Sequence, residues 1–229
     1  MNLRSFGARS IIKWSVWGLL GILFLVFLIR VLAFENSYYG GKEGSERAIV
    51  DENGSEVEEL IEEAPSEEEV QEYTVAADLP RYLSIEKLGI KNARILPMGV
   101  NSKGELDTPR NIFDVGWYEN SGKPGAGGTS IIDGHNGGPH VYGVFKELPS
   151  LATGDIIQIE RGDGKIFKYK VIDNNEIALN DSDSYMVSAS KTPEKGKESV
   201  TLISCTGEWS AKQDTYLSRQ FTRAVLVDE

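Results

Sequence analysis

A single cysteine raises the first question of chemistry in this chain. Cys205 ends the apolar run 201–205 (TLISC), and no other cysteine occurs among the 229 residues. A thiol has an ordinary pKa near ~8.5 and attacks only as the thiolate, so a nucleophilic cysteine needs a base or a cation beside it. His135, one of two histidines, likewise ends a strand-like run, 129–135 (TSIIDGH). A cysteine and a histidine are the minimum pair for thiol acyl transfer.

Two arginines near the C-terminus could supply a cation. Arg219 and Arg223 share strand parity and lead into the apolar run 224–227. A guanidinium is always charged and donates two parallel hydrogen bonds to a carbonyl or an oxyanion. Each residue also has a structural interpretation, because a lone cysteine is often a buried small residue and a strand arginine is often a solvated edge charge. The residue types alone leave both interpretations open.

Strands must position these residues. Strand-like runs follow residue 78 in close succession, and two of them flank an Asp-Gly turn typical of a β-hairpin. The runs are 82–85, 93–96, 127–133, 156–160, 166–171, 200–205 and 224–227. Many short strands with Gly- and Pro-rich connections predict an all-β domain that is closed, or nearly closed, into a barrel. Since side chains 201, 203 and 205 share one strand face, Cys205 is expected at a strand end that opens onto a cleft.

Little helix is expected in this domain. One or two helical turns are predicted over 144–151 (VFKELPSL). The stretch 171–199 is predicted to be a long irregular loop, and because it leads into the cysteine strand it is expected to form one wall of the site.

The N-terminal part has the pattern of a membrane anchor. Residues 14–34 form an almost entirely apolar stretch of 21 residues, close to the ~20 that span a bilayer as a helix. Three basic residues precede it, so the positive-inside rule places residues 1–13 in the cytoplasm and the bulk of the chain outside the cell. A cleaved signal peptide ending near 31–33 is the alternative, although the apolar run is longer than an ordinary signal core. We therefore expect a single-pass protein of the cell membrane.

The net charge is concentrated in one short segment. Residues 51–72 hold eleven acidic and no basic side chains, and the whole chain has a net charge of −11. Clustered like charge with few apolar residues predicts that 35–77 is a disordered acidic linker, with a short helix within 56–72 as an alternative. The folded domain is then 78–229. The absence of a basic stripe with interleaved aromatics argues against nucleic-acid binding, and one cysteine excludes an intramolecular disulfide.

The candidate residues stand in motifs that resemble those of the sortases, membrane-anchored cysteine transpeptidases of mostly Gram-positive bacteria. The family's cysteine motif, T-L-x-T-C, is present here as TLISC, with Ser204 in place of the second threonine. The family's histidine follows a glycine at the end of a strand, as His135 does. The segments that usually follow this histidine are matched by FKEL at 145–148 and GDII at 154–157.

The resemblance also bears on the arginine. In sortases the catalytic arginine begins the last strand and has a small residue five positions further on. Arg219 has Ala224 at that distance, whereas Arg223 has Asp228. We therefore favour Arg219, with Arg223 as the second choice. The resemblance covers about residues 80–229, and its three motifs occur in the family's order.

The resemblance implies an eight-stranded sortase-type β-barrel and a transpeptidase reaction. Cys205 would attack the Thr–Gly carbonyl of an LPxTG-like sorting signal on a surface protein and form a thioester acyl-enzyme. His135 would act as general acid and base, and Arg219 would bind the substrate carbonyl or the oxyanion. An amine of a cell-wall precursor, or another amine, would accept the protein. No cofactor or metal site is expected, and a Ca²⁺ requirement, the sorting motif, the acceptor and the sortase class are left open.

Three further residues are expected to orient the catalytic groups or to contact substrate: Asp133, Thr201 and Ser204. Asp133 lies two residues before His135 on the same strand face, where the family often has a small residue. Its carboxylate could orient the imidazole, but a carboxylate beside a thiolate also raises the thiol pKa, and a solvated or locally paired charge is the plainer alternative.

Two functions from different classes are compatible with the sequence. The segment before the first strand lacks the Asp-Pro-aromatic lid of the pilin-polymerising sortases, which favours an enzyme that anchors proteins to the cell wall. The alternative function is a catalytically idle, membrane-tethered barrel that binds peptides.

Overall fold

The structure is a computed structural model that describes residues 49–50, 56–57, 59–101, 104 and 106–227. The predicted cytoplasmic segment and membrane helix, 1–34, lie outside these residues. No helix within the described residues is long and apolar enough to span a membrane. The chain divides into two units, 1–57 and 58–229, and the described part of the first is an antiparallel pair of short strands, β1 (Ile49–Val50) and β2 (Glu56–Val57).

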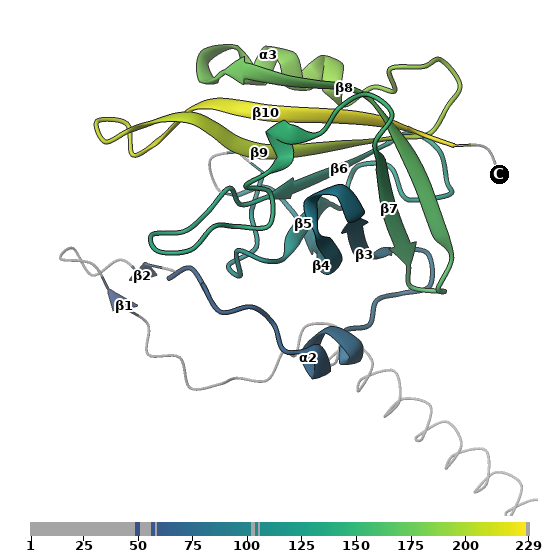
Figure 1. Ribbon diagram of the computed structural model, residues 1–229, viewed down its shortest axis with the longest axis horizontal. Coiled ribbons are helices and arrows are strands. Elements are labelled where there is room, and N and C mark those ends of the chain that lie inside the picture. The colour runs from purple at the N-terminus through teal and green to yellow at the C-terminus, as the bar shows by residue number, and fades with distance from the viewer. Residues whose placement is uncertain (1–48, 51–55, 58, 102–103, 105, 228–229) are drawn as a thin grey trace, which may run out of the picture. The chain divides into compact units, whose positions relative to one another are not determined.

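The second unit is a closed barrel of eight strands with few helices (Figure 1). Its elements, in chain order, are α2 (Glu67–Glu72), β3 (Pro80–Ile85), the 3₁₀ helix η1 (Glu86–Leu88), β4 (Ile90–Met98), β5 (Val115–Tyr118), β6 (Thr129–Gly134), the 3₁₀ helix η2 (Leu148–Ser150), β7 (Ile156–Arg161), β8 (Ile166–Ala178), α3 (Leu179–Ala189), β9 (Ser199–Ser210) and β10 (Thr215–Leu226). The order around the barrel is β10-β8-β7-β3-β4-β5-β6-β9. The pairs β4–β5 and β6–β9 are parallel and the others antiparallel. This confirms the predicted closed, eight-stranded, mainly β fold.

Alternate side chains of the strands fill the barrel. Val200 and Leu202 of β9 and Ile132 of β6 are fully buried in its core. The predicted hairpin joins β7 to β8, and Gly164 at its turn has a φ of 81°, which a glycine adopts without the steric cost that a side chain would incur. The Gly164 N–H donates to the carbonyl of Arg161 at 2.8 Å and closes the turn.

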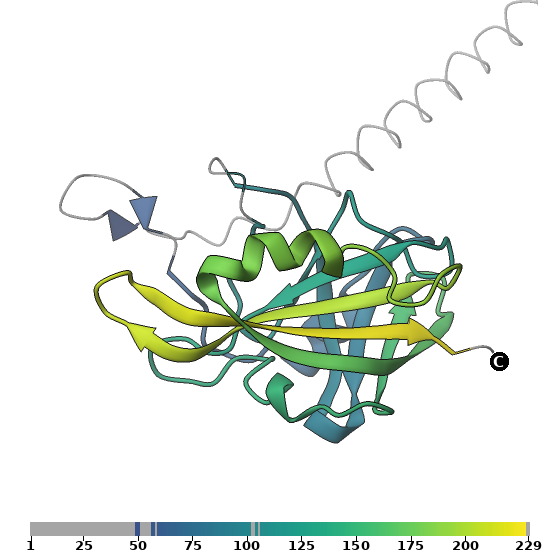
Figure 2. The same cartoon turned by 90° about the horizontal axis from the view of Figure 1, so that it is seen from above.

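A second apolar cluster lies on the outer face of the barrel. Ile131 of β6, Ile203 of β9 and Phe221 of β10 project outward there, and Tyr185 of α3 packs on them. Figure 2 shows α3 lying along this face of the sheet. Because both faces of β9 are covered at this point, its residues are continuously buried over 199–204 rather than buried at every second position.

Two predictions about the elements are corrected. Only residues 190–198 of the stretch 171–199 form an irregular loop, since β8 continues to residue 178 and α3 follows it. Its polar residues concealed the strand because they pair with the neighbouring strand β10: Asp173 binds Arg223, and Asn174 accepts from the Thr222 hydroxyl. Strand β5 was missed because it has four residues and is buried on both faces, so it shows no alternation. The helical turn predicted within 144–151 is η2.

Part of the predicted acidic linker contacts the barrel. Helix α2 begins with a capping box, in which the Glu69 N–H donates to Ser66 Oγ and the Ser66 N–H donates to the Glu69 carboxylate. Arg81 Nε then donates to the Tyr73 carbonyl, and the Tyr73 hydroxyl donates to the Ile95 carbonyl of β4. The folded unit therefore extends upstream of residue 78, because backbone and polar groups of this segment bond to the barrel.

Candidate active site

The candidate residues lie on the outer face of three neighbouring strands, β6, β9 and β10, at positions that are aligned across the strands. Arg219 on β10 is the direct cross-strand partner of Cys205 on β9. Strand β6 runs parallel to β9 with Asp133 opposite Ile203, so His135, two residues further along the same face, comes level with Cys205. Strand register thus brings a guanidinium, a thiol and an imidazole together at one end of the barrel.

His135 and Cys205 line the same surface pocket, whose volume is about 600 Å³. Its other walls come from residues 136–139, from the end of the β9–β10 hairpin and from Leu60. A pocket of roughly 300–1,000 Å³ suits a small ligand or a few residues of a peptide. No residue of 171–199 lines it, so the prediction that this stretch forms a wall is wrong. A larger hollow of about 720 Å³ contains neither Cys205 nor His135.

The thiol of Cys205 lies in an environment that favours its neutral form. Burial raises the pKa of Cys205, the positive charge of Arg219 lowers it, and the carboxylate of Asp133 raises it again. The net direction is upward, so the thiol is protonated at neutral pH and the thiolate is the minor form. Arg219 is the one favourable charge among these causes, which is the role expected of a cation beside a nucleophilic cysteine.

Asp133 acts on its neighbours through its charge. Burial raises the pKa of its carboxyl group, and four contacts oppose this rise: a hydrogen bond from Thr108 Oγ1 at 2.9 Å, the charge of His135, the backbone amide of Gly134 and the charge of Arg219. The hydrogen bond goes to Thr108 and not to the imidazole. The alternative of a locally paired carboxylate therefore describes Asp133 better than that of a carboxylate bonded to the imidazole.

The imidazole of His135 is oriented by the backbone. Its Nε2 lies 2.7 Å from the carbonyl oxygen of Pro109. A carbonyl only accepts, so Nε2 carries a proton and Nδ1 is the ring atom left to exchange a proton with substrate. The neighbouring backbone is tight as well, because a Cβ at Gly143 would lie 2.4 Å from the carbonyl oxygen of His135.

Asn136 is a residue of the site that we did not predict. It is 7% exposed, and its Nδ2 donates to the carbonyl oxygen of Cys205 at 2.7 Å. The bond ties the segment after His135 directly to the strand that carries the thiol. Only its position next to His135 could have drawn attention to Asn136, since the partner lies 69 residues further along the chain.

Arg219 does not line the pocket itself but bonds to residues that do. Its Nη1 donates to the carbonyl oxygens of Tyr216 and Ser218, both at 3.0 Å, and its Nη2 donates to Thr215 Oγ1 at 3.2 Å. These contacts hold the guanidinium at the end of the β9–β10 hairpin, whose residues Thr215 and Tyr216 line the pocket. The first choice of arginine is thus the one that the register places beside Cys205.

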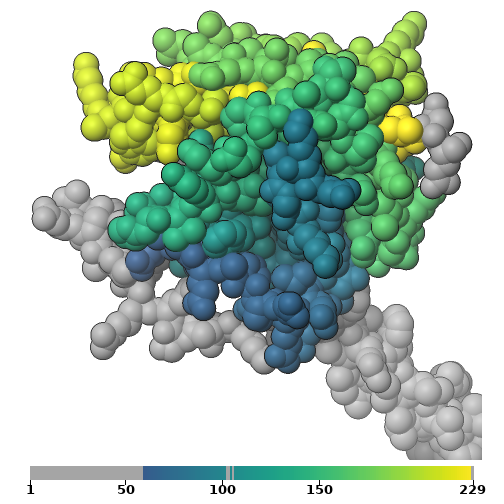
Figure 3. All heavy atoms as spheres, viewed as in Figure 1, coloured from purple at the N-terminus to yellow at the C-terminus, as the bar shows by residue number. Residues whose placement is uncertain are grey.

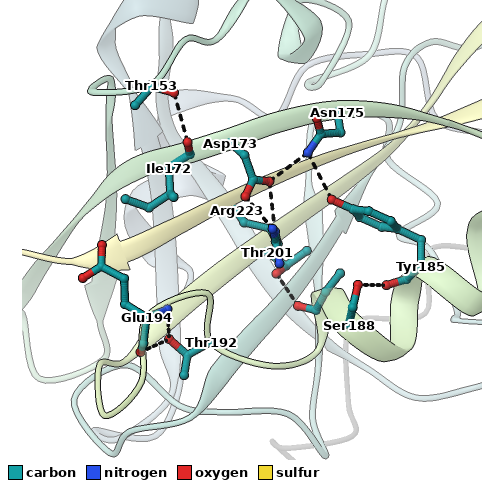
Figure 4. A network of polar contacts seen from close by, with 11 residues as sticks. Thr153, Ile172, Asp173, Asn175, Tyr185, Ser188, Thr192, Glu194, Thr201 and Arg223 are labelled. Carbon is teal, nitrogen blue, oxygen red and sulfur yellow. Dashed lines mark hydrogen bonds and ion pairs between the residues drawn. The ribbon is translucent and has the colours of Figure 1, made fainter.

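Arg223 has a different environment. It forms a two-bond ion pair with Asp173, with N···O distances of 2.9 and 2.5 Å. Figure 4 shows this pair within a polar network that includes Asn175 and the hydroxyl of Tyr185 on α3. Its cross-strand partner is Thr201, four residues from Cys205, which is roughly 13 Å along a strand. Arg223 is therefore placed to hold the sheet and not to serve the thiol.

The two other motif residues bond to backbone away from the pocket. Thr201 Oγ1 donates to the carbonyl oxygen of Ala189 at the end of α3, at 2.7 Å. Ser204 Oγ donates to the carbonyl oxygen of Gly134 on β6, at 2.8 Å. Both side chains are buried, and neither lines the pocket. They fix α3 and β6 against β9, which is a positional role.

Aromatic side chains form the outer wall of the pocket. Trp209 and Tyr216 face each other across the β9–β10 hairpin with ring centroids 5.2 Å apart and planes at 77°. Figure 3 shows this end of the hairpin, in yellow, projecting beyond the body of the barrel. Trp209 is 50% exposed, so the apolar surface of its ring is open to solvent at this wall. Within the described residues, no group of histidine, cysteine and acidic side chains is arranged to bind a metal ion.

A closed barrel with a thiol, an imidazole and a guanidinium at one end fits the class of cysteine acyltransferases. The sequence profile described as "Sortase domain" matches residues 83–227. Because this match covers more than half of the chain, the chain belongs to the sortase family, whose members are generally cysteine transpeptidases. A search of curated proteins found no match.

Several solved structures resemble the chain at low identity. Sortase C-1 from Actinomyces oris is 23% identical, with a TM-score of 0.46 and coverage of 68% of this chain and 76% of that one. A sortase D5 transpeptidase from Clostridium perfringens is 23% identical, with a TM-score of 0.46 and coverage of 72% and 90%. The lid mutant of sortase C1 from Streptococcus agalactiae is 19% identical, with a TM-score of 0.48 and coverage of 69% and 73%.

Proposed function

We propose that this chain is a cysteine transpeptidase that cleaves an LPxTG-like sorting signal between Thr and Gly and joins the surface protein to an amine of the cell wall. The observation that carries the proposal is the strand register that sets Arg219 opposite Cys205, together with the pocket that His135 and Cys205 both line. Family membership supports the reaction class, and the raised pKa of the thiol explains why a basic imidazole and a guanidinium must accompany it.

Acylation uses all three groups. The thiol proton passes to Nδ1 of His135, and the thiolate of Cys205 attacks the carbonyl carbon of the substrate threonine. The guanidinium of Arg219 stabilises the negative charge that develops on the carbonyl oxygen. As the Thr–Gly C–N bond breaks, Nδ1 returns its proton to the leaving amine, and a thioester remains on Cys205.

Transfer reverses these steps with a new amine. The acceptor amine attacks the thioester carbon and gives its proton to Nδ1 of His135. The C–S bond then breaks, the new amide leaves, and Cys205 departs as a thiolate that recovers the proton from the imidazolium. The enzyme is restored, and the sorting signal has exchanged one amide bond for another.

The proposal includes a place in the cell and a set of partners. A helix over 14–34 would anchor the chain in the cell membrane with residues 1–13 in the cytoplasm and the barrel outside, as the charge distribution favours. The partners would be surface proteins with a C-terminal sorting signal and a cell-wall precursor or another amine acceptor. This chemistry uses neither a cofactor nor a nucleic acid.

The test is direct observation of the acyl-enzyme. The full chain, purified in detergent, is incubated with a panel of LPxTG-type peptides and triglycine, and both chain and products are weighed by mass spectrometry. The wild type should gain the mass of the acyl fragment and release a triglycine-ligated peptide. Cys205→Ala and His135→Ala should do neither, whereas His140→Ala, which changes the other histidine outside the pocket, should behave as the wild type.

Failure is equally clear in this experiment. If the wild type forms no thioester with any peptide of the panel, or if Cys205→Ala retains ligation, the transpeptidase proposal is wrong. Peptide binding without thioester formation would favour the alternative, an idle peptide-binding barrel.

A further inference from the structure

Residues 59–63, here called the N-terminal strap, connect two loops on either side of His135. One is the histidine loop, residues 136–143, and the other is the segment 107–112 that precedes β5. The strap belongs to the folded unit although it lies in the acidic run that we predicted to be a disordered linker. Figures 1 and 3 show it, in blue, running beside the histidine loop.

The carboxylate of Glu62 binds the tip of the histidine loop. Its Oε1 accepts hydrogen bonds from the N–H groups of His140, at 2.8 Å, and Val141, at 3.1 Å. Gly138 lies against the same oxygen, since a Cβ there would be 2.3 Å from Oε1. Glu62 is half-buried, and hydrogen bonds to an ionised acceptor are stronger than neutral ones. The loop is therefore shaped to receive this carboxylate.

The histidine loop transmits this contact to the site. Two backbone hydrogen bonds close it into a small hairpin, from the Gly138 N–H to the Val141 carbonyl at 2.9 Å and from the Gly143 N–H to the Asn136 carbonyl at 2.8 Å. At the base of the hairpin, Asn136 Nδ2 donates to the Cys205 carbonyl. A movement of the tip of the loop would thus displace Asn136, and with it the neighbouring His135 and the Cys205 carbonyl to which Asn136 is bonded.

The residue next to Glu62 holds the opposite loop. The Ile61 N–H donates to the Arg110 carbonyl at 2.9 Å, and the Ile112 N–H donates to the Ile61 carbonyl at 3.1 Å. This loop supplies the Pro109 carbonyl that receives Nε2 of His135. Two consecutive strap residues therefore fix the loop that follows His135 and the loop whose carbonyl orients its imidazole.

The strap lines the pocket without blocking it. Leu60 lines the pocket together with His135 and Cys205, and the pocket retains a volume of about 600 Å³ with the strap in place. That volume leaves room for a few residues of a peptide. A strap that only blocked the site would fill this space.

We propose that Glu62 is a positioning residue, which fixes the histidine loop and so holds His135 in line with Cys205. The inference deepens the proposed function, and its kinetic test rests on that function. Its structural test does not, because the imidazole can be observed without substrate.

The experiment uses point variants of the full chain in detergent. Glu62→Ala removes the acceptor, Glu62→Gln keeps an oxygen in the same place, and Glu63→Ala is the matched control, which removes a neighbouring charge that binds neither amide. The first measurement is the NMR spectrum of the imidazoles, with His140→Gln used to assign His135. Glu62→Ala should shift or broaden the His135 signals, whereas Glu62→Gln and Glu63→Ala should leave them in place.

The second measurement is the kinetics with the LPxTG-type peptide that the wild type uses best. Glu62→Ala should lower kcat by about 10–100-fold, up to the cost of displacing a catalytic group by about 1 Å, with KM changed less than about twofold. Glu62→Gln should restore most of kcat. Gly138→Ala, whose methyl group would displace the carboxylate from the other side, should reproduce the Glu62→Ala effect.

Three outcomes would overturn the inference: unchanged His135 signals in Glu62→Ala, equal loss of kcat in Glu62→Ala and Glu63→Ala, or a rise in kcat when Glu62 is removed. The last would make the strap an inhibitory lid. If no chain forms a thioester, the wild type included, the proposed function fails, and the imidazole signals alone decide whether Glu62 positions His135.

Discussion

Replacing Arg219 and Arg223 by glutamine in parallel separates the charge that serves the thiol from the charge that holds the sheet. Arg219 is the cross-strand partner of Cys205 and lowers the pKa of its thiol. Arg219→Gln is expected to reduce kcat/KM by about 10²–10³, the usual cost of losing one donor to an oxyanion. Because the thiol then loses its favourable charge, its pKa should rise further, and the alkaline limb of the pH–rate profile, where the resting thiol loses its proton to solvent, should move to higher pH.

Arg223→Gln should affect stability instead. It breaks the two-bond pair with Asp173, whose side chain is 24% exposed while that of Arg223 is 20% exposed. Partial exposure screens this pair, so the expected loss of unfolding free energy is about 1–2 kcal/mol. For a domain of this size the loss corresponds to a fall in Tm of roughly 2–8 °C. Arg223 pairs with Thr201, which lies roughly 13 Å along the strand from Cys205, so kcat/KM should change less than about threefold.

Both quantities are measured on the same preparations of the full chain. Peptide ligation followed by mass spectrometry gives kcat/KM, and scanning fluorimetry gives Tm. The reasoning from strand register is refuted if Arg223→Gln loses as much activity as Arg219→Gln at an unchanged Tm. It is also refuted if Arg219→Gln retains the activity of the wild type.

Three further changes test other parts of the molecule. Asp133→Asn removes a charge that raises the pKa of Cys205, so the alkaline limb of kcat/KM should move to lower pH; an unchanged profile would show that Asp133 carries no charge over the pH range measured. Glu198 is 8% exposed and accepts hydrogen bonds from two glycine N–H groups and from the hydroxyl of Tyr169. Glu198→Ala leaves these buried donors unpaired and should lower the unfolding free energy in a urea titration by about 3–5 kcal/mol, and a loss below ~1 kcal/mol would contradict this view of the carboxylate. Trp209→Ala removes aromatic surface from the pocket wall and should raise KM for the peptide about fivefold, whereas a fall in kcat at constant KM would exclude a binding role.

Local patterns predicted much of this fold. Seven of the barrel strands were visible as alternating or apolar runs, because a strand that buries one face repeats every two residues. Strand β5 and the second half of β8 were not visible, because their side chains are covered on both faces or are paired with polar groups of a neighbouring strand. A pattern of hydrophobicity cannot report a partner that lies elsewhere in the chain.

The candidate site divides in the same way. Cys205 and His135 were found as reactive residue types, and the spacing to Ala224 favoured Arg219. The prediction that Cys205 ends its strand is wrong, because β9 continues to Ser210 and pairs with β10 beyond the thiol. The partners that hold them were missed: Asn136 bonds to a residue 69 positions away, and His135 to one 26 positions away. No local signal encodes such pairs, since they depend on the register of the closed barrel.

The sequence by itself indicated a mainly β protein with a thiol, an imidazole and two candidate guanidinium groups of the types that acyl transfer uses. Only the tertiary structure decided which arginine lies beside the thiol, that Nε2 of the imidazole is bound to Pro109, and that Glu62 of the acidic segment fastens the histidine loop. The physical reason is that residue types and periodicity are local properties. Hydrogen-bond geometry and charge proximity are instead set by the register in which distant strands and loops meet.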